Sequence, residues 1–400
     1  DDHIKGEGGK DTVHGGEGDD LIEGGMDSDL VYGDSGDDVV HGGTGGDVLI
    51  GGTGLDHLMG EEGEDTLQGG EDDDLLVGGS GADSLLGETG NDVLQGEADE
   101  DRLFGGSGHD LLQGGSEDDY LMGEGGNDTL QGDAGNDLLI AGTGNDLIEG
   151  GADNDTLEGN DGDDLLKGEG GNDWLQGQFG LDTLHGGAGQ DELEGAEGRD
   201  LLTGGYDPDI LEGHEGEDRL FGDEGADQLD GGSEDDLLVG GAGVDVLWGA
   251  TGDDRLEGGS EDDELYGEEG DDQLSGSEGA DLLYGDKGKD LLIGGSGKDQ
   301  ILGGIESDWL FGDRFNLNTS ESTFDEYKDF VLSVMLPEVE EYLILEHNED
   351  PETLNKYFEK EEVKNEIIKS EGREDISALI NENVPIKDRL EYIVDMRSLL

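Results

Sequence analysis

The sequence predicts an all-β fold in which about 35 nine-residue units form a parallel β-solenoid, followed by a small α-helical region. Three regularities predict the solenoid. Asp recurs every nine residues from Asp2 to Asp308, at all 35 positions, and an aliphatic residue stands two positions after each Asp. Gly stands four positions after the Asp in 34 of the 35 units, with Ala141 as the exception. The unit therefore reads G-x-x-G-x-D-x-L-x.

Each unit is predicted to be a turn and a short strand. The glycines mark a backbone that needs positive φ or a close approach, which Gly adopts without a Cβ penalty. The D-x-L-x segment is three or four residues long, with its aliphatic side chain on one face. One unit cannot bury this side chain alone, so we expect two units to make each 18-residue turn of a two-sheet parallel solenoid. The units would then give about 17 turns over roughly 80 Å.

The charge of the chain favours cations as partners. The net charge is -89, and residues 1–313 hold 10 Lys and Arg against 87 Asp and Glu, whereas residues 314–400 hold 10 against 22. Such an anion should repel nucleic acid and acidic membrane surfaces, which are bound through Lys and Arg. The absence of Cys excludes disulfides and thiolate metal sites.

The repeated Asp predicts a calcium-dependent fold. Burial of one aliphatic side chain per unit does not offset the conformational entropy of nine ordered residues, and a carboxylate at every turn adds repulsion. A bound cation must supply the difference. Asp carboxylates and turn carbonyls make an all-oxygen environment, which suits Ca²⁺ better than Mg²⁺. We therefore expect the chain to be disordered without calcium.

The repeat resembles the repeats-in-toxin, or haemolysin-type, calcium-binding nonapeptide repeats over about three quarters of the chain. This resemblance implies a right-handed parallel β-roll, in which Asp side chains and loop carbonyls of successive turns bind many Ca²⁺ ions. Eight loops match the strict G-G-x-G-x-D hexapeptide, and their implied calcium ligands are Asp20, Asp47, Asp56, Asp83, Asp110, Asp191, Asp245 and Asp299. Other loops that keep the third glycine extend the implied ligands to Asp11, Asp38, Asp65, Asp92, Asp128, Asp137, Asp146, Asp164, Asp173, Asp182, Asp200, Asp218, Asp227, Asp254, Asp272, Asp281 and Asp290.

Nine loops depart from the motif by carrying an acidic residue in place of the third glycine. These residues are Asp27, Asp72, Asp99, Glu117, Asp153, Asp207, Glu234, Glu261 and Glu306. Asp tolerates the left-handed conformation better than Glu does. The acidic side chains either join a calcium site or are solvated in loops that have lost or weakened their ion, and we favour the second interpretation.

The composition changes at residue 314, and residues 314–400 are predicted to form a separate helical region. A capping box at Thr323 and Glu326 precedes apolar residues at helical spacing, and three of the four Pro divide the segment. The resemblance implies that an uncleaved export signal occupies this place, read by a type I secretion apparatus. A folded cap for the solenoid end and a domain that binds a protein or cell-surface partner are equal alternatives.

Several other functions are disfavoured by the sequence. There is no H-E-x-x-H and no G-x-S-x-G motif, and carboxylate pairs such as Asp19 and Asp20 are expected in solvated loops, so we predict no enzyme within this chain. The seven His of the repeats are scattered over repeat positions and are assigned no metal or catalytic role. Ice binding is a minor alternative, because five scattered Thr make no flat array: Thr44, Thr53, Thr89, Thr143 and Thr251.

Aromatic residues stand one position after the buried aliphatic residue in seven units: Tyr32, Phe104, Phe221, Trp248, Tyr266, Tyr284 and Phe311. They are predicted to cover the outer face of the sheet, with a binding surface as the alternative.

The favoured function is a calcium-dependent folding module of a secreted, extracellular or cell-surface protein of the toxin, adhesin or surface-layer type. The alternative is the repeat and export region of a secreted hydrolase whose catalytic domain lies upstream. Since the chain opens inside a repeat, we expect it to be the C-terminal part of a longer protein.

Overall fold

The computed structural model of the chain describes residues 1–305 and 307–312, and all regular structure in this part is β. Each nine-residue unit provides one strand, β1 to β35, which confirms the predicted parallel solenoid of about 17 turns. The helices predicted for residues 314–400 lie outside the described residues. Within the part described, no helix is long and apolar enough to cross a membrane.

The chain divides into two compact units, of which the first is Asp1–Leu237. Its odd-numbered strands are β1 (His3–Gly8), β3 (Leu21–Met26), β5 (Val39–Thr44), β7 (His57–Glu62), β9 (Leu75–Ser80), β11 (Val93–Ala98), β13 (Leu111–Ser116), β15 (Thr129–Ala134), β17 (Leu147–Ala152), β19 (Leu165–Gly170), β21 (Thr183–Ala188), β23 (Leu201–Tyr206) and β25 (Arg219–Glu224). Its even-numbered strands are β2 (Thr12–Glu17), β4 (Leu30–Ser35), β6 (Val48–Thr53), β8 (Thr66–Glu71), β10 (Ser84–Thr89), β12 (Arg102–Ser107), β14 (Tyr120–Gly125), β16 (Leu138–Thr143), β18 (Thr156–Asp161), β20 (Trp174–Gly180), β22 (Glu192–Gly198), β24 (Ile210–Glu215) and β26 (Gln228–Ser233).

The second compact unit begins at Leu238. The remaining strands are β27 (Leu237–Ala242), β28 (Val246–Thr251), β29 (Arg255–Ser260), β30 (Glu264–Glu269), β31 (Gln273–Glu278), β32 (Leu282–Tyr284), β33 (Leu291–Ser296), β34 (Gln300–Leu302) and β35 (Trp309–Phe311). In this unit β28 pairs with β30, β30 with β32 and β32 with β34, while β29, β31, β33 and β35 pair in the same way.

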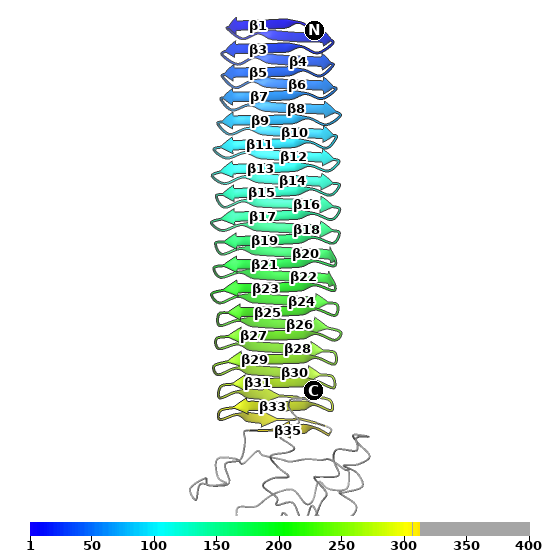
Figure 1. The fold of residues 1–400 in the computed structure, drawn as a ribbon, viewed down its shortest axis with the longest axis vertical. Helices are drawn as coiled ribbons and strands as arrows, with labels where there is room; N and C mark the ends of the chain where they lie inside the picture. Colours follow the sequence, from blue (N-terminus) through cyan, green and yellow to red (C-terminus); the bar gives the residue numbers. More distant parts are fainter. Residues whose placement is uncertain (306, 313–400) are drawn as a thin grey trace, which may run out of the picture. The chain divides into compact units, whose positions relative to one another are not determined.

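Two parallel sheets result because, within each unit, a strand pairs with the strand two places later in the chain. In the first unit Ile4 of β1 lies beside Ile22 of β3, and Val13 of β2 beside Val31 of β4. The register is therefore 18 residues, or two units per turn, in both sheets. Within the first unit, Figure 1 shows the odd-numbered strands running in one direction and the even-numbered strands in the other, as expected when successive nine-residue repeats coil back on themselves.

The strands are longer than the sequence predicted. Most contain six residues and continue through the first two glycines of the following loop, as Gly24 and Gly25 do in β3. Gly25, the second glycine of its loop, still pairs with Glu7 of the neighbouring strand, although the φ of Gly25 is 120°. Because each loop stacks on a loop of the same conformation, pairing extends into residues that would end an isolated strand.

The core consists of one aliphatic side chain from each strand. From Ile22 of β3 to Leu292 of β33 these side chains are 0–1% exposed, while the residues on either side of them in the strand face outward. Since successive side chains of a strand point to opposite faces, one residue per unit can be buried between the two sheets. This explains why the aliphatic position keeps its phase throughout the repeats.

Removal of one core side chain should destabilise the repeats, because no neighbour can fill the space. Leu229 of β26 is fully buried, whereas the preceding Gln228 is exposed. We expect Leu229→Ala to lower the free energy of unfolding of the calcium-saturated chain by about 2–5 kcal/mol. Gln228→Ala is the matched control and should change it by less than about 0.5 kcal/mol. Urea unfolding followed by circular dichroism measures both, and equal effects would contradict the single-column core.

Candidate metal centres

The repeated Asp residues are buried, although they carry charge. Those from Asp20 to Asp290 are at most 4% exposed, and of the predicted calcium ligands only Asp11 and Asp299 are half-buried. This corrects the expectation that Asp20 lies in a solvated loop, since only its neighbour Asp19 is exposed. The Asp precedes the first strand residue, so its side chain is directed inward while the residues on either side face out.

Each buried carboxylate connects two turns of the same edge. The backbone N–H of Asp92 donates to Oδ1 of Asp110 at 2.8 Å, and that of Asp110 donates to Oδ1 of Asp128 at 2.9 Å. The other set of loops makes the same bond between Asp residues 18 positions apart, as from the N–H of Asp83 to Oδ1 of Asp101 and from the N–H of Asp101 to Oδ1 of Asp119. The structure thus gathers the predicted ligands into two columns, one at each edge of the paired sheets.

The second carboxylate oxygen explains the glycine four positions after Asp. In loops such as that of Asp20, Oδ2 is buried and accepts no hydrogen bond. A Cβ atom on Gly15 of the same loop would lie 2.7 Å from this Oδ2 and 2.6 Å from the carbonyl oxygen of Gly33 in the next turn. Both distances are far below van der Waals contact, so the position strongly favours Gly, and Ala141 is the largest residue found there.

A loop carbonyl of the preceding turn lies close to the same carboxylates. The carbonyl oxygen of Gly45 and Oδ1 of Asp65 both lie within 3.2 Å of the point where a Cβ of Gly63 would stand. In the opposite set of loops the carbonyl oxygen of Gly108 and Oδ1 of Asp128 lie within 3.4 Å of the equivalent point. Carboxylate and carbonyl oxygens from successive turns therefore converge, and such a set of hard oxygen donors is the kind that Ca²⁺ prefers.

Burial makes the ionised state of these Asp residues costly. Desolvation is the largest cause that raises the pKa of Asp128 and Asp164 to about 6, and that of Asp101, Asp155 and Asp209 to about 8. Neighbouring carboxylates raise these pKa values further, whereas the backbone N–H bond lowers them. At neutral pH the columns therefore need protons or a cation to balance their charge.

The eight acidic loops that the structure describes differ from the others in backbone geometry. Asp27, Asp99, Glu117, Glu234 and the other described acidic residues at this position have φ values between 69° and 83°. This is the left-handed region, which disfavours side chains other than Gly, Asn and Asp.

Hydrogen bonds to these loops are also longer. The N–H at the third glycine position of one turn donates to the carbonyl oxygen that precedes the same position in the next turn. Where the next turn keeps its third glycine, the N to O distance is 2.7–3.0 Å, as from Gly45 to Glu62 and from Gly126 to Thr143. Where the next turn carries an acidic residue, the distance is 3.2–3.4 Å, as from Gly81 to Ala98. The N–H of Gly81 is shared with Oδ2 of Asp99 at 3.1 Å, and that of Gly216 with Oε2 of Glu234 at 3.1 Å. In these two loops the acidic side chain folds back onto the preceding turn.

Comparison with known protein families decides the classification. The model of the RTX calcium-binding nonapeptide repeat matches fifteen overlapping segments that together cover residues 1–316. The chain belongs to this RTX repeat family. The resemblance inferred from the residues is thereby confirmed, and with it the description of the chain as a calcium-binding repeat protein. No curated protein sequence matches the chain.

The RTX repeats also contain a second, exposed column of polar side chains, which was not predicted from the sequence. The residue before each buried Asp often accepts a hydrogen bond from its counterpart one turn later. The N–H of Asn136 donates to Oδ1 of Asp118 at 2.8 Å, and that of Asn154 donates to Oδ1 of Asn136 at 3.2 Å. The frequent Asn and Asp at this position were a signal for such a ladder, since short polar side chains bond nearby backbone groups.

Acidification should partly replace calcium. Burial raises the folded-state pKa above the ordinary value of 3.8, to about 6 for Asp128 and to about 8 for Asp101. Below about pH 4 these carboxyl groups are protonated in both states and do not lower the stability of the metal-free fold. As the pH rises towards 8 they lose protons more readily in the unfolded chain, so folding without metal becomes less favourable. We expect the metal-depleted chain to gain β-structure in far-UV circular dichroism between pH 8 and 4. A spectrum that does not change over this range would contradict the proton-for-cation argument.

Restoring the glycine in an acidic loop should stabilise the fold. Glu234→Gly removes a left-handed non-glycine residue, a change we expect to add about 1–2 kcal/mol to the free energy of unfolding in saturating calcium. Glu234→Gln keeps the backbone cost and removes only the charge, so it should recover less than half of that gain. Urea unfolding of the three proteins decides the matter. If the Gln variant gains as much as the Gly variant, charge rather than backbone conformation is responsible.

Proposed function

We propose that this chain is the calcium-dependent folding module of a secreted repeat protein of the toxin, adhesin or surface-layer type. Its Asp columns bind Ca²⁺ between successive turns, and this binding drives the chain from a disordered state to the parallel β-roll. The module itself is structural, and export through a type I secretion apparatus delivers it to the cell exterior.

The observation that supports this proposal is the pair of columns of buried Asp carboxylates. Each carboxylate receives its hydrogen bond from a residue 18 positions earlier, as Asp164 does from Asp146 at 2.8 Å, and Oδ2 of Asp164 is buried without a hydrogen bond. The oxygens that would hold an ion thus come together only when two turns are stacked. Binding and folding are therefore one event, and cooperativity should spread from turn to turn.

The compartment follows from calcium supply. Sites of this weak extracellular type bind with dissociation constants on the order of 10⁻⁴ to 10⁻³ M, which calcium satisfies outside a cell but not in the cytosol. The chain would stay unfolded inside the cell, where mutual repulsion of its carboxylates opposes compaction. Folding on arrival outside then prevents its return through the secretion apparatus.

The ligand role of the buried Asp can be tested against an adjacent exposed Asp. Asp164 is 3% exposed and belongs to a column, whereas Asp163 is exposed. We expect Asp164→Asn to raise the calcium concentration at half-folding by at least twofold and to remove about one bound ion. Asp163→Asn makes the same chemical change and should shift the midpoint much less. Circular dichroism gives the midpoint and calorimetry gives the number of ions.

The proposal as a whole depends on the wild-type titration, with magnesium as the control ion. Cooperative gain of β-structure with calcium, and little gain with magnesium, is the expected result. Full strand content in the presence of EGTA, or calcium binding that leaves the spectrum unchanged, would show that calcium is not the folding partner.

A further inference from the structure

Three side chains with metal-binding atoms meet on the outer face of the even-numbered sheet in the first unit. Glu194 of β22 and Glu212 of β24 occupy the same position in neighbouring strands, and His214 lies two residues beyond Glu212. One ligand atom from each lies within 4.8 Å of the other two, a set found once among the described residues. The Asp columns at the loops contain no imidazole, so this cluster is chemically different from them.

Two of the three distances between ligand atoms in the cluster are close to those around a small tetrahedral cation. Nε2 of His214 lies 3.2 Å from Oε1 of Glu194 and 3.3 Å from Oε2 of Glu212. Ligand atoms at about 2.0–2.2 Å from Zn²⁺ in tetrahedral geometry are separated by about 3.3–3.5 Å. Calcium takes six to eight oxygen ligands at longer distances and does not favour imidazole, so the cluster should prefer a transition-metal ion.

Neighbouring residues hold the first carboxylate in place. Nε2 of Gln176, one turn earlier in β20, donates to Oε2 of Glu194 at 2.5 Å, which leaves Oε1 facing His214. The position of His214 is occupied one turn earlier by Ala196, whose methyl group leaves room for the Glu194 side chain to reach across the strands. Groups that orient a ligand from behind are a usual part of metal sites.

The arrangement is costly without a cation. Glu194 and Glu212 are direct cross-strand neighbours, and Asp230 of β26 follows Glu212 at the same position. Like charges opposite each other destabilise a sheet. A positive charge at Nε2, from a proton or from a metal ion, offsets this repulsion.

We propose that Glu194, Glu212 and His214 form a surface site for a divalent transition-metal ion of the Zn²⁺ class, separate from the calcium columns. His214 supplies Nε2, and each glutamate supplies one oxygen. The coordination is completed by water, because the cluster lies on a half-exposed face. The site exists only when β22 and β24 are paired, so it reports the folded state of the module.

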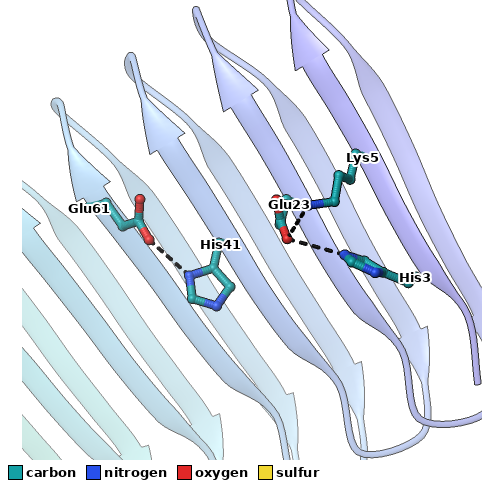
Figure 2. Close-up of polar contacts among 5 residues, drawn as sticks. All are labelled: His3, Lys5, Glu23, His41 and Glu61. Carbon is teal, nitrogen blue, oxygen red and sulfur yellow. Dashed lines mark hydrogen bonds and ion pairs between the residues drawn. The ribbon is translucent and has the colours of Figure 1, made fainter.

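A matched control is present in the same chain. His41 and Glu61, 20 residues apart as Glu194 and His214 are, also form a diagonal imidazole–carboxylate pair, with Nδ1 of His41 2.9 Å from Oε1 of Glu61. Figure 2 shows this pair, and beside it Glu23, which is held by Lys5 and His3. This pair is not part of a three-ligand cluster, so it should bind zinc no better than ordinary surface carboxylates.

The test uses the full chain in saturating calcium, with Zn²⁺ added at one equivalent. X-ray absorption at the zinc edge should detect one imidazole in the zinc shell, and calorimetry should resolve one zinc site above the background of weak carboxylate binding. We expect His214→Gln to weaken that site at least tenfold and to remove the imidazole signal. Glu194→Gln should weaken it severalfold, and His41→Gln should leave it unchanged. Circular dichroism in calcium confirms that each variant is folded.

Three results would overturn the proposal. One is a wild-type chain without a zinc site tighter than the carboxylate background, which would make the cluster a set of hydrogen-bonded surface side chains. Another is an imidazole signal that persists in His214→Gln. The third is an equal loss in His41→Gln. None of these depends on whether calcium drives folding, because folding is measured separately.

Discussion

The structure depends on one carboxylate that bridges two turns. In loops such as that of Asp92, Oδ1 of the repeated Asp accepts the N–H of the Asp 18 residues earlier, here Asp74 at 2.8 Å, and Oδ2 is packed against the first glycine of its own loop. Register, glycine pattern and charge all follow from this placement. A slip by one residue would turn the carboxylate outward and the aliphatic side chain into solvent.

The same placement couples the fold to cations. Buried carboxylates are normally paired or protonated, because the cost of desolvating an isolated charge is large. Here the carboxylates stack above one another, and the backbone N–H groups compensate them only in part. The charge of the fold is therefore balanced only when the carboxylates bind protons or a cation.

The repeats are uniform in phase but not in detail. Acidic residues at the third glycine position lengthen the contact to the preceding turn and adopt strained φ values, and the outer faces carry local features of their own. Trp248, Tyr266 and Tyr284 stack on successive strands with centroid distances of 6.1 and 5.0 Å, consistent with the expectation that aromatics cover the sheet. Glu194, Glu212 and His214 gather in a different column. A repetitive core thus leaves the exposed positions free to acquire separate chemistry.

The sequence by itself determined the fold class, the two-unit turn and the column of core residues, because a strict nine-residue period permits only one way to bury the aliphatic position. It also identified the family to which the repeat belongs, and it predicted Asp as the cation ligand. Tertiary structure alone decided which groups meet. The burial of Asp20, the contact of Oδ2 with Gly15 and the proximity of Glu194 to His214 all join residues in different loops or turns. Such contacts depend on the stacking of turns and on the direction of each side chain, neither of which a linear pattern specifies.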